Sequence, residues 1–203
     1  MNLTDWADRR NVQSALENGV KLLAARGVVD ADRTGIAGFS EGSVIAAWAV
    51  FNSRLFKVAS IGSGPMGPDV IALQGHATGS GFRASGYPSP AERREDFWKR
   101  ISFEYNAATL ETPTLMQVPE SESLLAMRAI NIARERKRPL ELFVFPGAYH
   151  YKWQPAHRLA VYQRNLDWFD FWLRGVEREN APSSEYVQWR EWRQRFNLGS
   201  GRQ

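Results

Sequence analysis

Short apolar stretches alternate along the chain with longer stretches in which apolar residues recur at helical spacing. The short stretches are bounded by Gly, Pro, Ser or charged residues, which is typical of buried strands. They lie at 34–39, 57–61, 113–118 and 140–145. Strands that alternate with helices predict an α/β fold, in which about four parallel strands form a sheet with helices on both faces.

Helices are predicted between and after these strands. They are expected at 11–26, 41–51, 92–105, 121–137 and 155–175. Pro155 occupies a favoured first position of the last helix, and Gly175 closes it. The apolar stripe of this helix consists of Leu159, Tyr162, Leu166, Phe169 and Leu173.

Two segments lack this regularity. Residues 62–90 are rich in Gly, Pro and Ser, which predicts a long loop, and long loops in compact domains are often functional. Beyond Glu177 the chain is polar, with Trp189 and Trp192 as exceptions. We therefore expect one domain at 1–178, followed by a loosely packed polar extension at 179–203.

Composition narrows the class of protein. Hydrophobic residues make up 43% and charged residues 24% of the 203 residues, which is ordinary for a globular domain. Cysteine is absent, which excludes disulfides and cysteine-based sites. No apolar run reaches the roughly 20 residues needed to cross a bilayer, and the polar N-terminus lacks the apolar core of a signal peptide. A soluble cytoplasmic protein without a membrane partner is therefore expected.

Charge and histidine content narrow the class further. The net charge of +4 comes from arginines spread along the chain, which favours solvated helix faces over a nucleic-acid surface. The three histidines, His76, His150 and His157, are not in ligand spacing with a carboxylate on one helix face. We therefore expect no nucleic-acid partner, no metal and no cofactor.

The strongest local signal is the pentapeptide Gly38-Phe39-Ser40-Glu41-Gly42, which has the pattern G-x-S-x-G. It stands between a predicted strand and a predicted helix, where a sharp turn exposes the serine hydroxyl. Glycine at both flanking positions removes Cβ atoms that would collide in such a turn. The pattern predicts Ser40 as a nucleophile and the backbone N–H of Glu41 as an oxyanion donor. The alternative is an ordinary Gly-Ser turn.

A serine nucleophile needs a base that takes its proton. His150 follows the last predicted strand, and the carboxyl ends of parallel strands share one sheet edge, where ligands bind in open α/β sheets. His76 lies in the predicted loop and His157 in the first turn of a helix. His150 is therefore the predicted base for Ser40.

The acid that would orient this imidazole is expected in the loop after the third predicted strand. Glu120 and Glu122 both lie there, and either could instead be a charge that stabilises a helix N-terminus. Tyr151 and Trp153 follow the predicted base and are candidates to bind substrate, with Trp98 as a weaker one. The alternative is that these aromatic residues pack in the core.

Four segments are distributed within residues 5–175: GVVDADRTGIAGFSEGS, ETPTLMQVPESE, RPLELFVFPGAYH and RNLDWFDFWLRG. They resemble the catalytic domain of the prolyl oligopeptidase family of serine peptidases. Within this family the chain looks most like the lasso peptide isopeptidases. That likeness is carried by residues 149–172, YHYKWQPAHRLAVYQRNLDWFDFW, and by the use of glutamate as the acid.

This resemblance implies an α/β-hydrolase fold and a Ser-His-Glu triad, with Ser40, Glu122 and His150 at the positions of the family motif. It implies hydrolysis of a peptide or isopeptide bond through an acyl-enzyme, on a lasso peptide as substrate. One departure is Glu41-Gly42-Ser43, where relatives more often carry an aromatic or polar residue and then Gly-Gly. A glutamate beside the oxyanion site would weaken that site unless its side chain points away.

By the same resemblance, the predicted strands correspond to strands 5–8 of a sheet with the order 1-2-4-3-5-6-7-8. The strand before Ser40 then lies at an edge, and an exposed apolar edge strand invites pairing. The family's N-terminal β-propeller and a second oxyanion donor are not among the matching segments. We therefore expect the C-terminal half of the α/β-hydrolase fold, in a fragment that needs a missing N-terminal portion or a partner chain. The alternatives are an esterase or acyl hydrolase with the same triad, and an inactive fragment.

Overall fold

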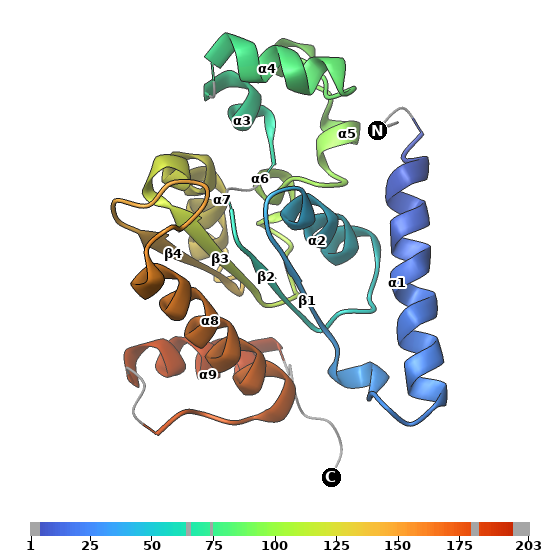
Figure 1. The fold of residues 1–203 in the computed structure, drawn as a ribbon, viewed down its shortest axis with the longest axis vertical. Coiled ribbons are helices and arrows are strands. Elements are labelled where there is room, and N and C mark those ends of the chain that lie inside the picture. Colours follow the sequence, from blue (N-terminus) through green and yellow to red (C-terminus); the bar gives the residue numbers. More distant parts are fainter. Residues whose placement is uncertain (1–4, 64–65, 74, 180–182, 197–203) are drawn as a thin grey trace.

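The computed structural model describes residues 5–63, 66–73, 75–179 and 183–196, which form a four-stranded parallel sheet with the order β1-β2-β3-β4 (Figure 1). The strands are β1 (Gly35–Gly38), β2 (Val58–Ile61), β3 (Thr114–Pro119) and β4 (Leu140–Phe145). The parallel register places Gly38 beside Ile61, so the carboxyl ends of the strands share one edge. The predicted strands and their parallel arrangement are confirmed.

One face of the sheet is covered by α2 (Glu41–Asn52) and α7 (Ser123–Glu135). Side chains alternate along a strand, and Ile61, Met116 and Val118 point to this face. The short helix α6 (Phe103–Asn106) adds the fully buried Phe103. These residues form one buried cluster with Ala46, Ala47, Ala126, Ala129 and Ile130. The small alanines let both helices approach the sheet closely.

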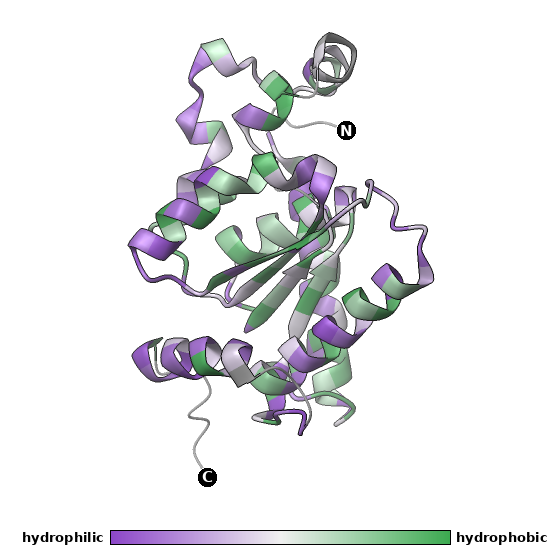
Figure 2. Cartoon of the chain, turned by 90° about the vertical axis from the view of Figure 1, so that its left-hand side faces the viewer, coloured by the Kyte–Doolittle hydropathy of each residue, from purple (hydrophilic) through white to green (hydrophobic). Residues whose placement is uncertain are grey.

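The opposite face is covered by α8 (Pro155–Phe169), which continues as a π-helical turn at Asp170–Arg174, and by α9 (Ser183–Phe196). Val58 and Leu115 pack there against Trp168 of α8 and Trp189 of α9, and both indole rings are fully buried. Figure 2 shows helices on both sides of the apolar sheet, as predicted. Gly175 ends the long helix with φ 70°, a conformation that glycine adopts readily.

The predicted loose packing of the C-terminal segment is wrong for the residues that the structure describes. Tyr186, Trp189 and Trp192 recur every three residues of α9 and are at most 6% exposed. Aromatic rings at this spacing in an otherwise polar segment indicate an amphipathic helix, which the polarity of the segment obscured. The division into a domain at 1–178 and an extension at 179–203 stays a prediction.

A buried carboxyl group joins α9 to the sheet. Glu141 of β4 accepts a hydrogen bond from the indole N–H of Trp189, and burial raises the pKa of Glu141 to about 7. The unfolded chain loses this proton near pH 4.5, whereas the folded chain keeps it until about pH 7. Between these values the unfolded state binds fewer protons, so the free energy of unfolding falls as the pH rises.

We expect the free energy of unfolding to fall by up to about 3 kcal/mol between pH 4.5 and pH 7, measured by urea unfolding. Glu141→Gln keeps an acceptor for Trp189 but cannot ionise, so it should remove most of this decline. Glu135→Gln, at an exposed position of α7, is the control and should leave the decline unchanged. Identical pH profiles for Glu141→Gln and the wild type would contradict the prediction.

Residues 62–90, predicted as a loop, instead contain α3 (Pro68–Leu73) and α4 (Gly75–Ala84), which lie above the carboxyl edge of the sheet in Figure 1. Val70, Ile71 and Phe82 of these helices pack into a second cluster with Trp98. Tertiary packing therefore stabilises helices that the glycine-rich composition disfavours. The single helix predicted at 92–105 is divided into α5 (Glu95–Trp98) and α6.

The first helix, α1 (Ala7–Ala25), begins before its predicted start at residue 11. Its N-terminal end packs beside α2, where Trp6 stacks on Trp48 with ring centroids 5.1 Å apart. Figure 1 shows α1 running along the outside of α2. The helix therefore belongs to the same layer as α2, at the edge of the sheet that β1 forms.

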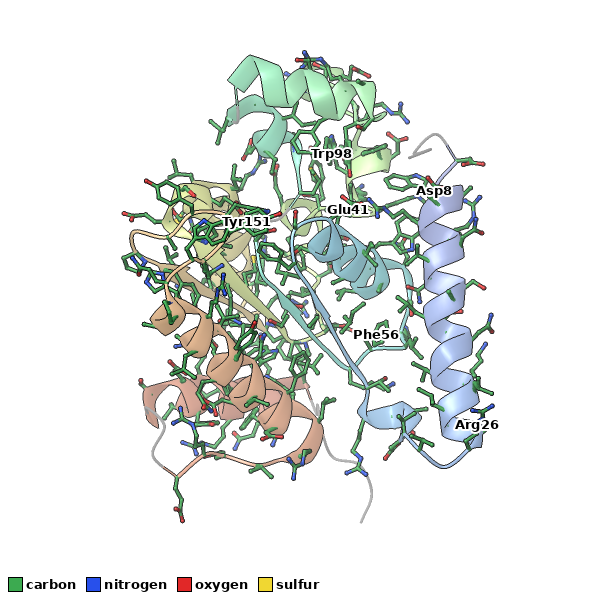
Figure 3. The ribbon with its side chains drawn as sticks, in the orientation of Figure 1. Asp8, Arg26, Glu41, Phe56, Trp98 and Tyr151 are labelled. Atoms are coloured by element: carbon green, nitrogen blue, oxygen red, sulfur yellow. The ribbon has the colours of Figure 1, made fainter. Side chains whose placement is uncertain are left out.

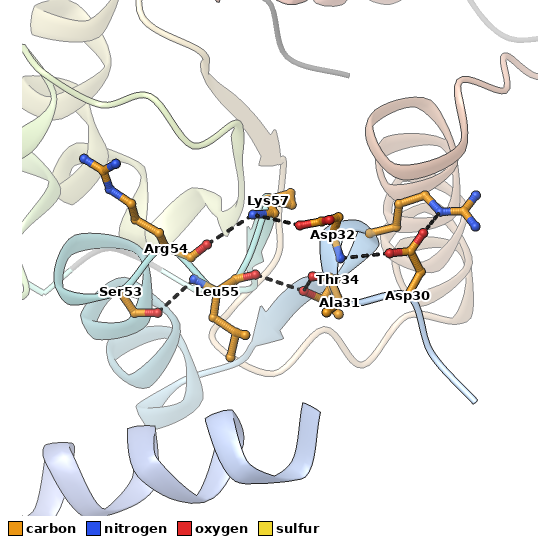
Figure 4. Close-up of polar contacts among 9 residues, drawn as sticks. Asp30, Ala31, Asp32, Thr34, Ser53, Arg54, Leu55 and Lys57 are labelled. Carbon is orange, nitrogen blue, oxygen red and sulfur yellow. Dashed lines mark hydrogen bonds and ion pairs between the residues drawn. The ribbon is translucent and has the colours of Figure 1, made fainter. Parts of the chain in front are cut away.

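A polar cluster ties the start of β1 to the loop before β2 (Figure 4). Thr34 donates from Oγ1 to the carbonyl oxygen of Leu55 at 3.0 Å, and Nζ of Lys57 lies 3.8 Å from the Asp32 carboxylate. The Asp30 carboxylate accepts the backbone N–H of Asp32 at 2.9 Å. These contacts hold the amino ends of β1 and β2 together. They thereby support the pairing of the two strands, at whose carboxyl edge the G-x-S-x-G turn lies.

The apolar stripe predicted for α8 divides in two. Phe169 and Leu173 pack toward the sheet, whereas Leu159, Tyr162 and Leu166 are 60–68% exposed. A hollow of about 490 Å³ lies between the exposed part of α8 and β1, and residues of both elements line it. Within the described residues β1 pairs only with β2, so its other edge is unpaired.

Candidate active site

Ser40 stands at a sharp turn between β1 and α2, as the G-x-S-x-G pattern predicts. Its backbone has φ 56° and ψ −121°, a conformation that a residue with a side chain adopts only when its surroundings enforce it. The N–H of Gly42 donates to the Phe39 carbonyl at 2.8 Å, and the N–H of Ser43 donates to the Ser40 carbonyl at 2.9 Å. The serine is thereby held at the carboxyl edge of the sheet, at the N-terminus of α2.

The two glycines of the turn differ in their surroundings. A Cβ atom at Gly38 would lie 2.0 Å from the carbonyl oxygen of Gly42, which no structure tolerates without backbone movement. A Cβ atom at Gly42 would meet nothing within 4 Å. The expectation that glycine prevents a collision is therefore correct for Gly38 and wrong for Gly42. The backbone of Gly42 occupies the space that a Cβ atom at Gly38 would need, whereas a side chain at Gly42 itself would meet no obstacle.

The loops after β3 and β4 bring a carboxylate and an imidazole into contact. Pro119 lies beside Phe145 in the parallel register, so the two loops leave the sheet together. Oε1 of Glu122 lies 2.6 Å from Nδ1 of His150, the distance of a charge-assisted hydrogen bond. A donor N–H at Nδ1 leaves Nε2 to accept a proton from a hydroxyl group. The Glu122 side chain is 12% exposed and that of His150 39%, so the acid is shielded while the imidazole reaches solvent.

Ser40, Glu122 and His150 line one hollow of about 350 Å³ at this edge. The remaining wall comes from α2, α7 and the segment after β2. It consists of Glu41, Val44, Ser63, Met66, Val70, Phe82 and Leu125. The structure therefore brings the three predicted catalytic side chains to one cavity, while their roles stay predictions. Ser63, a buried hydroxyl after β2, was missed because nothing local distinguishes it from other serines.

The remaining candidates for base and acid lie in other surroundings. Glu120 accepts the backbone N–H of Gly147 at 2.7 Å, which ties the loop after β3 to the turn after β4. His157 lies in the first turn of α8, with its ring 5.7 Å from that of Phe145. His76 belongs to α4, and its side chain lies outside the described part of the structure. Of the two glutamates, the one in contact with the imidazole is Glu122.

Tyr151 and Trp153 form an exposed row of rings beside His150. Their side chains are 59% and 71% exposed, and the two ring centroids are 5.9 Å apart. Tyr151 also lies 5.6 Å from the ring of Phe39, and Figure 3 shows it at the carboxyl edge of the sheet. Trp98, the weaker candidate, is in contrast 1% exposed in the cluster beneath α3 and α4, so for this residue the alternative of packing in the core holds and a substrate-binding role is wrong.

Lys152, which the sequence analysis did not single out, lines the neighbouring hollow between β1 and α8. Its Nζ donates to the carbonyl oxygens of Gly62 and Gln117 at 3.4 Å each, which links the ends of β2 and β3. Burial lowers the pKa of Lys152, and the nearby charge of Glu122 opposes this effect. The signal that could have identified Lys152 as a neighbour of the site is its position in the sequence, two residues after His150.

The described ranges hold no helix long and apolar enough to cross a membrane. Nor do their His, Asp and Glu side chains form a group of three or more that could hold a metal ion. The expected cytoplasmic location stays a prediction.

Known peptidases are similar to this chain over most of its length. The model of the prolyl oligopeptidase family matches residues 8–176. Lasso peptide isopeptidase AtxE2 of Asticcacaulis excentricus is 34% identical over 190 residues, which are 92% of this chain and 27% of that protein. The structure of an AtxE2 variant with Astexin3-dC4 bound has a TM-score of 0.88 at 33% identity, and the match covers 95% of this chain and 30% of that one.

A more distant structure supports the fold alone. An acylaminoacyl peptidase of Pyrococcus horikoshii has a TM-score of 0.67 at 19% identity, over 91% of this chain and 30% of that one. The chain thus spans less than a third of the length of these relatives. The four parallel strands and their helices are the C-terminal part of an α/β-hydrolase domain, as predicted. On the match of the family model over residues 8–176, the chain belongs to the prolyl oligopeptidase family.

Proposed function

We propose that this chain carries the catalytic residues of a serine peptidase that hydrolyses a peptide or isopeptide bond. The observation that carries the proposal is the 2.6 Å contact between Glu122 and His150 in the hollow that Ser40 also lines. Loops after three different strands supply these side chains, and the strained backbone of Ser40 is typical of a nucleophile turn. Membership of a peptidase family supports the same reaction class.

In the proposed reaction Nε2 of His150 takes the proton of the Ser40 hydroxyl as its oxygen attacks the carbonyl carbon of the scissile bond. Glu122 accepts the hydrogen bond of Nδ1–H and stabilises the imidazolium. The backbone N–H of Glu41 donates to the oxyanion of the tetrahedral intermediate. His150 then protonates the leaving amine, and water hydrolyses the acyl-enzyme with the same imidazole as base. This series of reaction steps needs no cofactor.

Labelling with a fluorophosphonate probe tests the nucleophile. The natural polypeptide that contains these residues should be labelled, and its Ser40→Ala variant should not. Ser43→Ala removes a buried hydroxyl from the same turn and is the matched control, so it should be labelled like the wild type. Labelling that survives in Ser40→Ala, or its absence from the wild type, would contradict the proposal.

A lasso peptide is the proposed substrate, because AtxE2, a lasso peptide isopeptidase, is 34% identical over nearly the whole chain. Hydrolysis of a threaded lasso peptide, of the same peptide without the isopeptide bond and of simple esters should be compared. Preference for the threaded peptide supports the isopeptidase assignment. A preference for esters would instead identify an esterase with the same triad.

The exposed rings beside His150 offer a surface for such a peptide. We expect Trp153→Ala to raise KM for the peptide about tenfold and to change kcat less than about twofold, because the ring contacts substrate away from the reacting bond. Leu22→Ala removes a half-exposed side chain of α1 and is the control, which should change neither constant. A fall in kcat at unchanged KM would argue against a binding role for Trp153.

We further propose that an N-terminal portion of the natural polypeptide outside these residues packs against β1 and the exposed part of α8. The unpaired edge of β1, the exposed Leu159, Tyr162 and Leu166 and the hollow between the two elements support this proposal. The chain also spans only 27% of the length of AtxE2. Amide hydrogen exchange in residues 35–38 should be slower in the longer polypeptide than in this chain alone, and equal rates would contradict the proposal.

A further inference from the structure

The side chain of Glu41 presents an electrostatic problem for the proposed reaction. The backbone N–H of Glu41 is the proposed oxyanion donor, yet Glu41 itself lines the same hollow as Ser40. A carboxylate near a developing oxyanion repels it, and this repulsion is stronger where protein replaces water. The reaction therefore requires that this carboxylate be neutralised or held away from the oxyanion.

Arg9 of α1 contacts this carboxylate. Its Nη2 donates to Oε1 of Glu41 and forms an ion pair between α1 and the first residue of α2. The Arg9 side chain is 4% exposed and the Glu41 side chain 50%, so the arginine lies buried beneath the carboxylate. Burial of a guanidinium is unfavourable unless an opposite charge pairs with it. An ordinary ion pair at the protein surface would leave the guanidinium in water and would not require its burial.

The surroundings of this ion pair hold it in place. Trp6, just before α1, stacks on Trp48 of α2, which anchors the N-terminal end of α1 beside the turn. Tyr87 faces the pair from a third segment. Burial raises the pKa of Tyr87, the charge of Glu41 adds to this rise, and the charge of Arg9 opposes it. Figure 3 shows Glu41 at the N-terminal end of α2, level with the start of α1. The contact thus belongs to a packed aromatic cluster.

We infer that Arg9 is a positioning residue for the reaction, which holds the Glu41 carboxylate toward α1 and neutralises its charge beside the oxyanion site. This inference rests on the proposed function of Ser40. It explains how a glutamate can follow the nucleophile, because the buried arginine cancels the repulsion between the Glu41 carboxylate and the developing oxyanion. A purely structural tie between α1 and α2 would instead affect folding stability and leave the charge of Glu41 without consequence for the reaction.

A double-mutant cycle separates these two roles. The natural polypeptide and its variants Arg9→Met, Glu41→Gln and Arg9→Met/Glu41→Gln are compared by the second-order rate constant of Ser40 labelling with a fluorophosphonate. We expect Arg9→Met to slow labelling about 10- to 100-fold, because it leaves an unpaired carboxylate beside the oxyanion. Glu41→Gln keeps the backbone N–H and removes the charge, so its labelling rate is the reference for the double variant. The double variant should return to within about threefold of Glu41→Gln, since the harmful charge is gone.

Folding stability is measured on the same proteins by urea unfolding. If Arg9→Met does not fold, the comparison of the double variant with Glu41→Gln decides, because the double variant contains neither of the two charges. Labelling of the double variant within about tenfold of the rate of Glu41→Gln supports the inference. A loss of more than about tenfold relative to Glu41→Gln in the folded double variant overturns it, because Arg9 would then act independently of Glu41. Absence of Ser40 labelling in the wild type would overturn the proposed function itself, and with it this inference.

Discussion

Glu122→Gln is expected to slow both Ser40 labelling and peptide hydrolysis by about 10³–10⁴-fold. The carboxylate accepts the hydrogen bond from Nδ1 of His150 at 2.6 Å and is largely shielded from water, so no solvent molecule readily replaces it. An amide in its place carries no charge to stabilise the imidazolium and can donate to Nδ1, which favours the wrong tautomer. The measurements are the labelling rate constant and kcat, with near-UV circular dichroism as the check of folding.

Glu120→Gln is the matched control for this prediction. Its side chain lies two residues away and accepts the backbone N–H of Gly147, a contact that the amide oxygen of glutamine can keep. Labelling should therefore stay within about threefold of the wild type. If Glu120→Gln is the slower of the two variants, the assignment of the acid to Glu122 is wrong.

Gly38→Ala is expected to destabilise the fold by more than about 4 kcal/mol, or to prevent folding. The added Cβ would lie 2.0 Å from the carbonyl oxygen of Gly42 and 2.8 Å from the backbone nitrogen of Ser43. These are backbone atoms at the start of α2, which cannot move aside as a flexible side chain could. Relief of the clash would open the turn and break the hydrogen bond from the N–H of Gly62 to the Gly38 carbonyl, which is 2.7 Å long.

Gly42→Ala makes the same chemical change four residues later and serves as the control. The new methyl group would enter open space on a helix, where alanine is favoured over glycine by up to about 1 kcal/mol. This variant should be as stable as the wild type or slightly more stable in urea unfolding, and its Ser40 should still be labelled. Equal stability of Gly38→Ala and the wild type would contradict the close approach of these backbone segments.

Local patterns predicted the elements whose stability comes from near neighbours in sequence. The apolar strands and the helices beside them follow from periodicity, and the turn at Ser40 follows from a pentapeptide. Residues 62–90 were predicted as a loop because glycine and proline disfavour helices locally. Helix α3 forms there because Val70 and Ile71 bury their side chains in one cluster with Trp98, which lies more than twenty residues away, and Phe82 of α4 packs against the same cluster.

Among the candidate site residues, local patterns in the sequence predicted Ser40, His150 and the short loop that contains the acid, and the family resemblance singled out Glu122 within that loop. The tertiary structure decided independently which glutamate contacts the imidazole, since the parallel register of β3 and β4 brings Glu122, and not Glu120, to His150. It also placed Arg9 against Glu41, a contact across 32 positions that no local pattern encodes. The physical reason is the same in both cases. Hydrophobic periodicity specifies elements, whereas side-chain partners depend on how distant elements pack.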